Sequence, residues 1–118
     1  MRFVFLFPLL LLHSLPALAR NDYHRCDPST QMGLNFCAHE EWMAADAELN
    51  RLWGVVKPRA DARGTGQALL NEQRAWLARR DATCEPEQQG GGSAAPMFYW
   101  RCMEELTLRR NAELRALR

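Results

Sequence analysis

The 118-residue sequence lacks the patterns of several fold classes. Polar and apolar residues do not alternate as they do in half-buried strands, so no sheet is predicted. No segment repeats another, which argues against a repeat array. The apolar run at residues 3–12 is interrupted by Pro8 and is shorter than the roughly 20 residues of a membrane-spanning helix. A helical fold outside the membrane is the remaining expectation.

The sequence also lacks residue arrangements that are typical of catalysis or cofactor binding. Adjacent helical residues point in divergent directions, so Glu40-Glu41 and Glu104-Glu105 do not form the facing carboxylates of a glycosidase. The glycine-rich residues 88–93 have no preceding strand and no following lysine, unlike a phosphate-binding loop. Basic residues are not clustered among aromatic ones, as they are in nucleic-acid-binding surfaces. We predict a protein that is not an enzyme, holds no cofactor and binds no nucleic acid.

The N-terminus does contain the pattern of a secretory signal peptide. A short basic start precedes the apolar run, and Ala17 and Ala19 place small residues where signal peptidase reads the chain. We predict a signal peptide over residues 1–19 and a mature chain over residues 20–118. Cys26 lies seven residues beyond the predicted cut, so no lipid anchor is expected. The mature protein is therefore predicted to be periplasmic and soluble, with no membrane anchor.

Four cysteines remain in the mature chain. An even number in a small exported chain indicates disulfides, and four cysteines allow three pairings. We predict the pairs Cys26–Cys37 and Cys84–Cys102, because each bond closes a short local loop.

A zinc site is the alternative for the first two cysteines. His24-x-Cys26 and Cys37-x-His39 together offer four possible zinc ligands. An oxidising compartment favours the disulfide over thiolate ligands. We therefore predict no metal.

In the first half of the mature chain, apolar or small residues recur every three or four positions. This spacing predicts an amphipathic helix over residues 30–56. Ser29 or Thr30 can cap its start. Pro58 is expected to end it, because a proline disfavours a helical residue before it. Residues 59–66 are then a short polar linker.

The second predicted helix, residues 67–84, contains no proline or glycine. Leu70, Leu77 and Cys84 are seven positions apart and share one face. We expect the other helices to pack on this one, and Pro86 to end it.

A third helix is predicted after the glycine-rich loop, with Ser93 as its cap and Pro96 in its first turn. Its expected core residues are Tyr99, Cys102, Met103, Leu106, Leu114 and Leu117. The predicted fold is all-α, a small antiparallel bundle of three helices, or of four if a kink divides one, stapled by two disulfides.

Polar residues interrupt or border the apolar faces of all three predicted helices. Gln73, Arg80 and Asp81 could form a catalytic face, but buried polar residues more often satisfy one another's hydrogen bonds. We therefore predict a structural network beneath the helices. Its expected members are Asp46, Asn50, Gln73, Trp76, Asp81 and Arg110.

Charge is unevenly distributed along the mature chain. Residues 20–50 carry six acidic and two basic residues, a balance of −4, whereas residues 51–118 carry eight acidic and twelve basic residues, a balance of +4. Solvated faces of ordinary helices explain such a pattern. An acidic surface for a cationic partner explains it as well, with Glu40, Glu41 and Glu48 as the contact residues.

Four motifs, in order, resemble those of one known family. They are Cys26 with Thr30-Gln31 and Asn35-x-Cys37; Asp46-Ala47-Glu48-Leu49-Asn50; Gln73-Arg74-Ala75-Trp76 through Arg80-Asp81-x-x-Cys84; and Gly91-Gly92-Ser93 with Cys102, Thr107-x-x-Arg110 and Glu113-Leu114. From about Cys26 to Leu114 the chain resembles the LprI-like lysozyme-inhibitor domain family of bacterial envelope proteins. It departs from the family at Gly33, where an acid is common, and in lacking the lipoprotein cysteine of some members.

The resemblance implies an all-helical, disulfide-stapled envelope protein and, for some members, inhibition of lysozyme. The first functional hypothesis is a binding protein that blocks a cationic, lysozyme-like muramidase. The second is a non-catalytic envelope module, accessory or structural, with another partner. In either case the expected partner is a protein.

Overall fold

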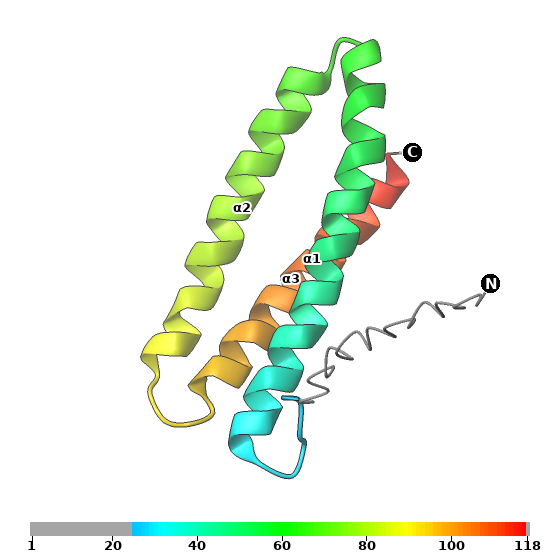
Figure 1. Cartoon of the computed structure of the whole chain (residues 1–118). Coiled ribbons are helices and arrows are strands. Elements are labelled where there is room, and N and C mark those ends of the chain that lie inside the picture. The colour runs from blue at the N-terminus through cyan, green and yellow to red at the C-terminus, as the bar shows by residue number, and fades with distance from the viewer. Residues whose placement is uncertain (1–24, 118) are drawn as a thin grey trace, which may run out of the picture.

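The structure is a computed structural model that describes residues 25–117. The predicted signal peptide and His24 lie outside the described residues. Three helices follow one another as α1 (Gln31–Ala62), α2 (Gly66–Gln89) and α3 (Ala95–Ala116). Figure 1 shows α1 and α2 running antiparallel, with α3 returning alongside α1. No strand occurs within residues 25–117, so the all-α prediction is confirmed as a bundle of three helices.

Of the two predicted caps of α1, Ser29 and Thr30, the structure has Thr30. The backbone N–H of Gly33 donates a hydrogen bond to the Thr30 hydroxyl oxygen at 2.9 Å. Gly33 is buried because the preceding loop folds back on it. A Cβ atom at this position would lie 1.8 Å from the carbonyl oxygen of Asp27. Close backbone approach therefore explains a glycine in the first turn of this helix.

The predicted end of the first helix at Pro58 is wrong, because α1 continues through it to Ala62. Proline removes the hydrogen bond to the carbonyl of Gly54, but both residues are exposed, so water can satisfy that carbonyl. Beyond Pro58, Ala60 is buried in the core, and Lys57 pairs with Asp61 at 2.7 Å across the proline. Core packing after the proline keeps the helix intact. The linker between α1 and α2 therefore spans residues 63–65, not the predicted residues 59–66.

The predicted end of the second helix at Pro86 is also wrong. α2 runs on to Gln89, and residues 85–89 are all exposed, so the missing hydrogen bond again faces solvent. The chain turns only at the glycines, where Gly91 and Gly92 adopt positive φ angles of 74° and 79°.

The predicted cap of the third helix is displaced by one residue. The cap position is Ala94, which makes no side-chain capping hydrogen bond, and Pro96 lies in the first turn as expected. Ser93 contributes its carbonyl oxygen instead, which accepts a hydrogen bond from the Asn35 side-chain amide at 2.9 Å. This contact joins the start of α3 to the start of α1.

The core lies mainly between α1 and α3, not around α2 as expected. Its central cluster is Leu49, Leu52, Val56, Ala60, Leu69 and Leu114, with Trp53 and Trp76 packed against it. Of the residues expected to face the core from α3, Met103 and Leu114 are buried, whereas Leu117 is exposed. Tyr99, Cys102 and Leu106 are partly buried.

Both predicted disulfides are present, Cys26–Cys37 and Cys84–Cys102. The first ties the N-terminal loop to α1, and the second ties the end of α2 to α3. Since Cys26 and Cys37 are bonded to each other, they offer no thiolates to zinc. Within residues 25–117 no group of three or more potential metal-ligating side chains is found. None of the helices in this range is both long and apolar enough to cross a membrane.

Candidate functional site

A buried arginine joins α3 to α2. Arg110 is 3% exposed. Its Nε donates to the Gln73 side-chain oxygen at 2.8 Å, and its Nη1 donates to Glu72 at 2.7 Å and to Glu113 at 2.6 Å. The guanidinium is therefore enclosed, whereas both carboxylates that neutralise it reach solvent.

A second buried arginine, Arg80, joins α2 to both other helices. Its Nε donates to Asp81 at 3.0 Å, and its Nη1 lies 3.4 Å from the Thr107 hydroxyl of α3. The same Nη1 lies 3.9 Å from the carboxylate of Asp46 on α1. Asn50 donates to Asp46 at 3.4 Å from an exposed position at the edge of the group.

Trp76 lies between the two arginines. The guanidinium carbons of Arg80 and Arg110 lie 5.2 Å and 5.9 Å from its ring centroid, within cation–π range. The structure thus brings all six predicted network residues into one chain of contacts. A groove of about 290 Å³ borders it, lined by Asp46, Leu49, Asn50, Trp53, Leu70, Gln73, Arg74 and Leu77.

Sequence reasoning missed two fully buried polar residues on α3. Thr107 donates to the Met103 carbonyl at 2.7 Å, and the Asn111 amide donates to the Ala45 carbonyl at 3.0 Å. The signal was available, because these residues are four positions apart and fall in the same helical stripe as Met103 and Leu114. The two carboxylates on Arg110, those of Glu72 and Glu113, were also absent from the predicted network.

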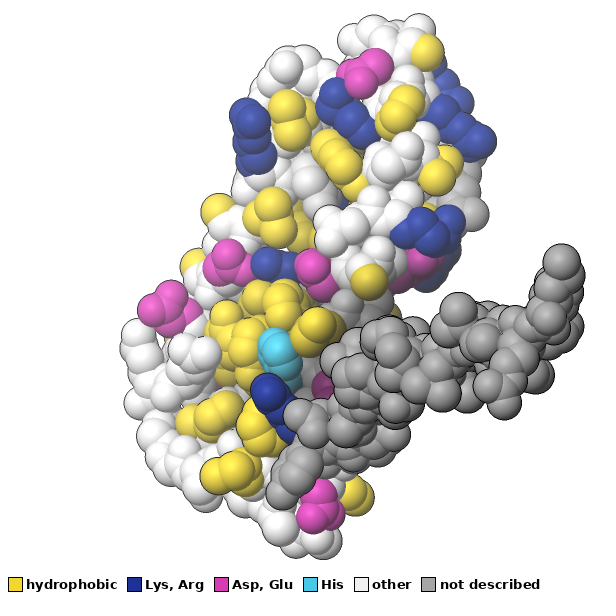
Figure 2. Space-filling model, viewed as in Figure 1, with side chains coloured by type: hydrophobic (Ala, Val, Ile, Leu, Met, Phe, Trp, Pro, Cys, Tyr) yellow, Lys and Arg dark blue, Asp and Glu magenta, His cyan; other side chains and the backbone are white. Residues whose placement is uncertain are grey.

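An aromatic cluster occupies the side of the bundle where α1 and α3 begin. Trp42 and Trp100 stack with ring centroids 4.7 Å apart, and His39 meets Trp100 edge-on at 4.4 Å. Tyr99 packs against the same indole at 4.7 Å. Figure 2 shows hydrophobic side chains gathered around a histidine on this face. A pocket of about 360 Å³ adjoins the cluster, lined by Met32, Asn35, Phe36, His39, Pro96 and Trp100.

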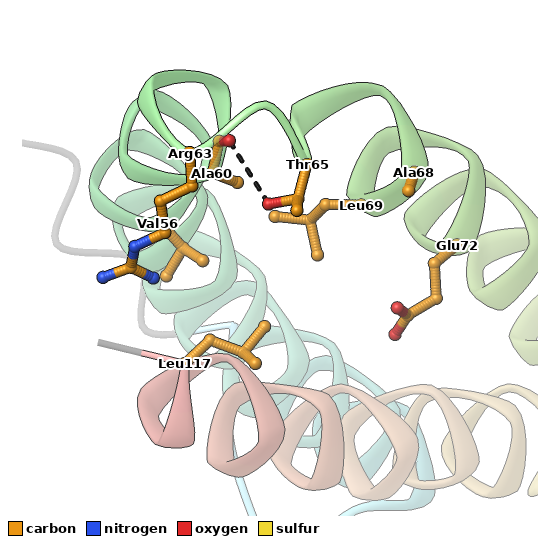
Figure 3. Close-up of a pocket in the computed structure, with 8 residues that line it drawn as sticks. All are labelled: Val56, Ala60, Arg63, Thr65, Ala68, Leu69, Glu72 and Leu117. Atoms are coloured by element: carbon orange, nitrogen blue, oxygen red, sulfur yellow. Dashed lines mark hydrogen bonds between the residues drawn. The ribbon is translucent and has the colours of Figure 1, made fainter.

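A smaller pocket of about 240 Å³ lies at the opposite end of the bundle. Figure 3 shows its lining side chains, which are Val56, Ala60, Arg63, Thr65, Ala68, Leu69, Glu72 and Leu117. Thr65 donates to the Ala60 carbonyl at 3.2 Å and closes the turn between α1 and α2. Arg63 and Glu72 oppose each other across the opening, so the lining carries no net charge. No residue of the predicted site lines this pocket.

The three acids predicted to contact a partner differ in their surroundings. Glu40 and Glu41 are exposed. Glu48 is only partly exposed, which corrects the expectation that it is an exposed acid like the other two. Hydrogen bonds from Arg51 above all, and from Arg115, lower the pKa of Glu48 from 4.5 to about 2. Its oxygens lie 2.7 Å from Arg51 and 3.1 Å from Arg115.

Glu41 has an acidic neighbour on α3. Burial, followed by the negative charge of Glu41, raises the pKa of Glu104. Nearby Arg101 opposes this effect without cancelling it. An exposed acid of α1 and a partly buried acid of α3 are therefore near enough to repel each other.

Comparison with known proteins gives three findings. A family model described as "Lysozyme inhibitor LprI" matches residues 25–114. An uncharacterised protein of Rhizobium meliloti (strain 1021) is 38% identical over 124 aligned residues, which cover 92% of this chain and 89% of the relative. No solved structure gives a significant match.

Proposed function

The chain belongs to the LprI lysozyme-inhibitor family, and on that basis we propose that it inhibits a cationic, lysozyme-like enzyme by direct protein–protein contact. The observation that carries the proposal is the charge of α1. Residues 31–50 contain four acids and no lysine or arginine. Glu40 and Glu41 are exposed and form no ion pair within residues 25–117. An acidic surface of this kind attracts a basic enzyme and speeds their encounter.

Rigidity also supports an inhibitory role. The first half of α1 is held at its start by the Cys26–Cys37 disulfide and along its length by α3. Asn111 fixes the two helices in register through the Ala45 carbonyl. A surface ordered before binding loses little conformational entropy when the partner docks, which favours affinity.

Export to the periplasm is part of the same proposal. The predicted signal peptide over residues 1–19 supports it, and so do the two disulfides, since such bonds persist in oxidising compartments. An inhibitor placed there would meet a lysozyme before the enzyme reaches peptidoglycan.

The test is a cell-wall clearing assay with purified residues 20–118 and lysozymes of several classes. Clearing should slow in proportion to the added protein for at least one class. Added salt should relieve the inhibition, because charge steering is screened beyond about 8 Å at physiological ionic strength. Unchanged clearing at large molar excess with every class would contradict the proposal and favour an envelope module with another partner.

A further inference from the structure

The outward face of α1 carries several apolar side chains that are exposed or only partly buried. Residues at spacings of four, four, three and four form one stripe along it. They are Met32, Phe36, Glu40, Met43 and Ala47. Met32 is 70% exposed and Met43 is 53% exposed, among the most exposed large hydrophobic residues in the described chain. We call these five residues the α1 stripe.

The α1 stripe continues into a hollow. Met32 and Phe36 also line the 360 Å³ pocket whose far wall is Pro96 and Trp100. A ridge of flexible methionines beside an aromatic pocket can adapt to a partner's surface and receive one of its side chains.

Charge indicates what kind of partner fits. Glu40 lies within the stripe and Glu41 beside it, and neither forms an ion pair within residues 25–117, whereas Arg80 lies near Asp46 and two arginines hold Glu48. Two bases lie in the neighbourhood: Arg25, whose guanidinium lies over Phe36 at the stripe's first turns, and Arg101, which lies near Glu104 on α3. The free negative charge is thus concentrated at the middle of the stripe, which matches a cleft edged by lysine or arginine.

We propose, as an extension that rests on the proposed function, that the α1 stripe is the docking face and seats in a concave surface of the cationic enzyme. Glu40 and Glu41 meet basic residues at the edge of that surface. Met32 and Met43 pack within it, and the pocket beside Trp100 receives a side chain of the enzyme. Binding of one face of a helix in a groove is a common mode of protein recognition.

Two substitutions of matched exposure test the face. Met43→Arg places a bulky positive charge on the stripe, whereas Leu108→Arg does the same on α3, where Leu108 is 49% exposed. Both side chains are already solvated, so both variants should keep the wild-type melting temperature. Met43→Arg should raise the concentration for half-maximal inhibition at least about tenfold, and Leu108→Arg should leave it within about twofold.

Methyl NMR of the four methionines in residues 20–118 gives an independent readout. On titration with the inhibited lysozyme, the signals of Met32 and Met43 should shift or broaden, while those of the buried Met97 and Met103 should stay near their free positions.

The outcomes separate the docking face from the function. If wild-type protein inhibits but Met43→Arg inhibits equally well, or Leu108→Arg is the variant that fails, the stripe is not the docking face and the proposed function stands. If wild-type protein inhibits no lysozyme and the methionine signals do not move, the function fails and the docking face fails with it.

Discussion

At the scale of single residues, the charged side chains divide into those neutralised inside the fold and those left for solvent. Glu48 is held by Arg51 from its own helix and by Arg115 from α3. Arg110 is enclosed by three acceptors from α2 and α3. Glu40 and Glu41 have no such cation among the described residues. On α1, Glu40 and Glu41 are therefore the acids left free to act on a partner.

The pairing of Glu48 predicts a specific acid sensitivity. Its folded-state pKa is about 2, below the ordinary value of 4.5. Its contribution to stability is therefore fully present above the unfolded-state pKa and is lost as pH falls from 4.5 towards about 2. Carboxyl NMR titration should give a midpoint near 2, and Glu48→Gln should lose less stability than wild type across this window. A midpoint near the ordinary value would show that the arginines do not hold this carboxylate.

The enclosure of Arg110 predicts a large effect of its removal. Arg110→Ala should lower the free energy of unfolding by about 3 kcal/mol, because Gln73 loses its partner and the packing on Trp76 is lost. Glu72→Ala is the matched control. Glu72 is 56% exposed and Glu113 remains on the guanidinium, so it should cost less than about 1 kcal/mol. Urea denaturation measures both, and equal losses would argue against a buried guanidinium.

At the scale of the helices, the surroundings of each glycine and proline decide whether a helix tolerates it. Gly33 lies against the backbone of Asp27, whereas Gly54 has nothing within 4 Å of where a Cβ would be. Pro58 and Pro86 both lie inside helices at exposed positions. The effect of a glycine therefore depends on what lies beside its Cα, and the effect of a helical proline on whether the carbonyl it leaves without a partner can reach water.

The two glycines of α1 predict effects of opposite sign. Gly33→Ala should destabilise the protein by about 2 kcal/mol, because its Cβ must push away the loop closed by Cys26–Cys37. Gly54→Ala should stabilise the protein by about 1 kcal/mol. Alanine has a higher helix propensity than glycine, and no atom lies within 4 Å of the added Cβ. Chemical denaturation of the two variants and of the wild type measures both changes in the free energy of unfolding. A stabilising Gly33→Ala would mean that the loop does not rest on α1.

At the scale of the whole molecule, the helices are joined unequally. α3 contacts both other helices, and α1 and α2 contact each other least. Arg80 and the Cys84–Cys102 disulfide attach α2 to α3. The first half of α1, which carries the free acids, therefore depends on α3 for its support.

The position of those acids predicts how charge reversal affects inhibition. Glu40→Lys/Glu41→Lys should slow association with a cationic lysozyme more than it speeds dissociation, and its effect should shrink at high salt. Glu85→Lys/Glu87→Lys makes the same change in charge at exposed positions near the end of α2 and should have a smaller effect. Surface-plasmon-resonance kinetics at two salt concentrations measure the difference. Equal effects of the two double variants would indicate general charge attraction without a defined face.

The sequence by itself determined the features that depend on neighbours along the chain. The helical class follows from residue spacing, a cap at Ser29 or Thr30 from residue type, and the disulfide pairing from short loop lengths. These are local effects, so a pattern within about one helical turn, or one short loop, contains the necessary information.

Only the tertiary structure decided where helices end and which charges are neutralised. Pro58 does not end α1, because Ala60 beyond it is held in a core built with α2 and α3. Glu48 is paired with Arg51 one turn along its own helix, but only the fold brings Arg115 to it from 67 residues away. Burial and ion pairing depend on which residues the fold brings together, and single-sequence patterns do not specify those distances. The free acids and the exposed methionines of α1 are for that reason visible as one surface only in the folded molecule.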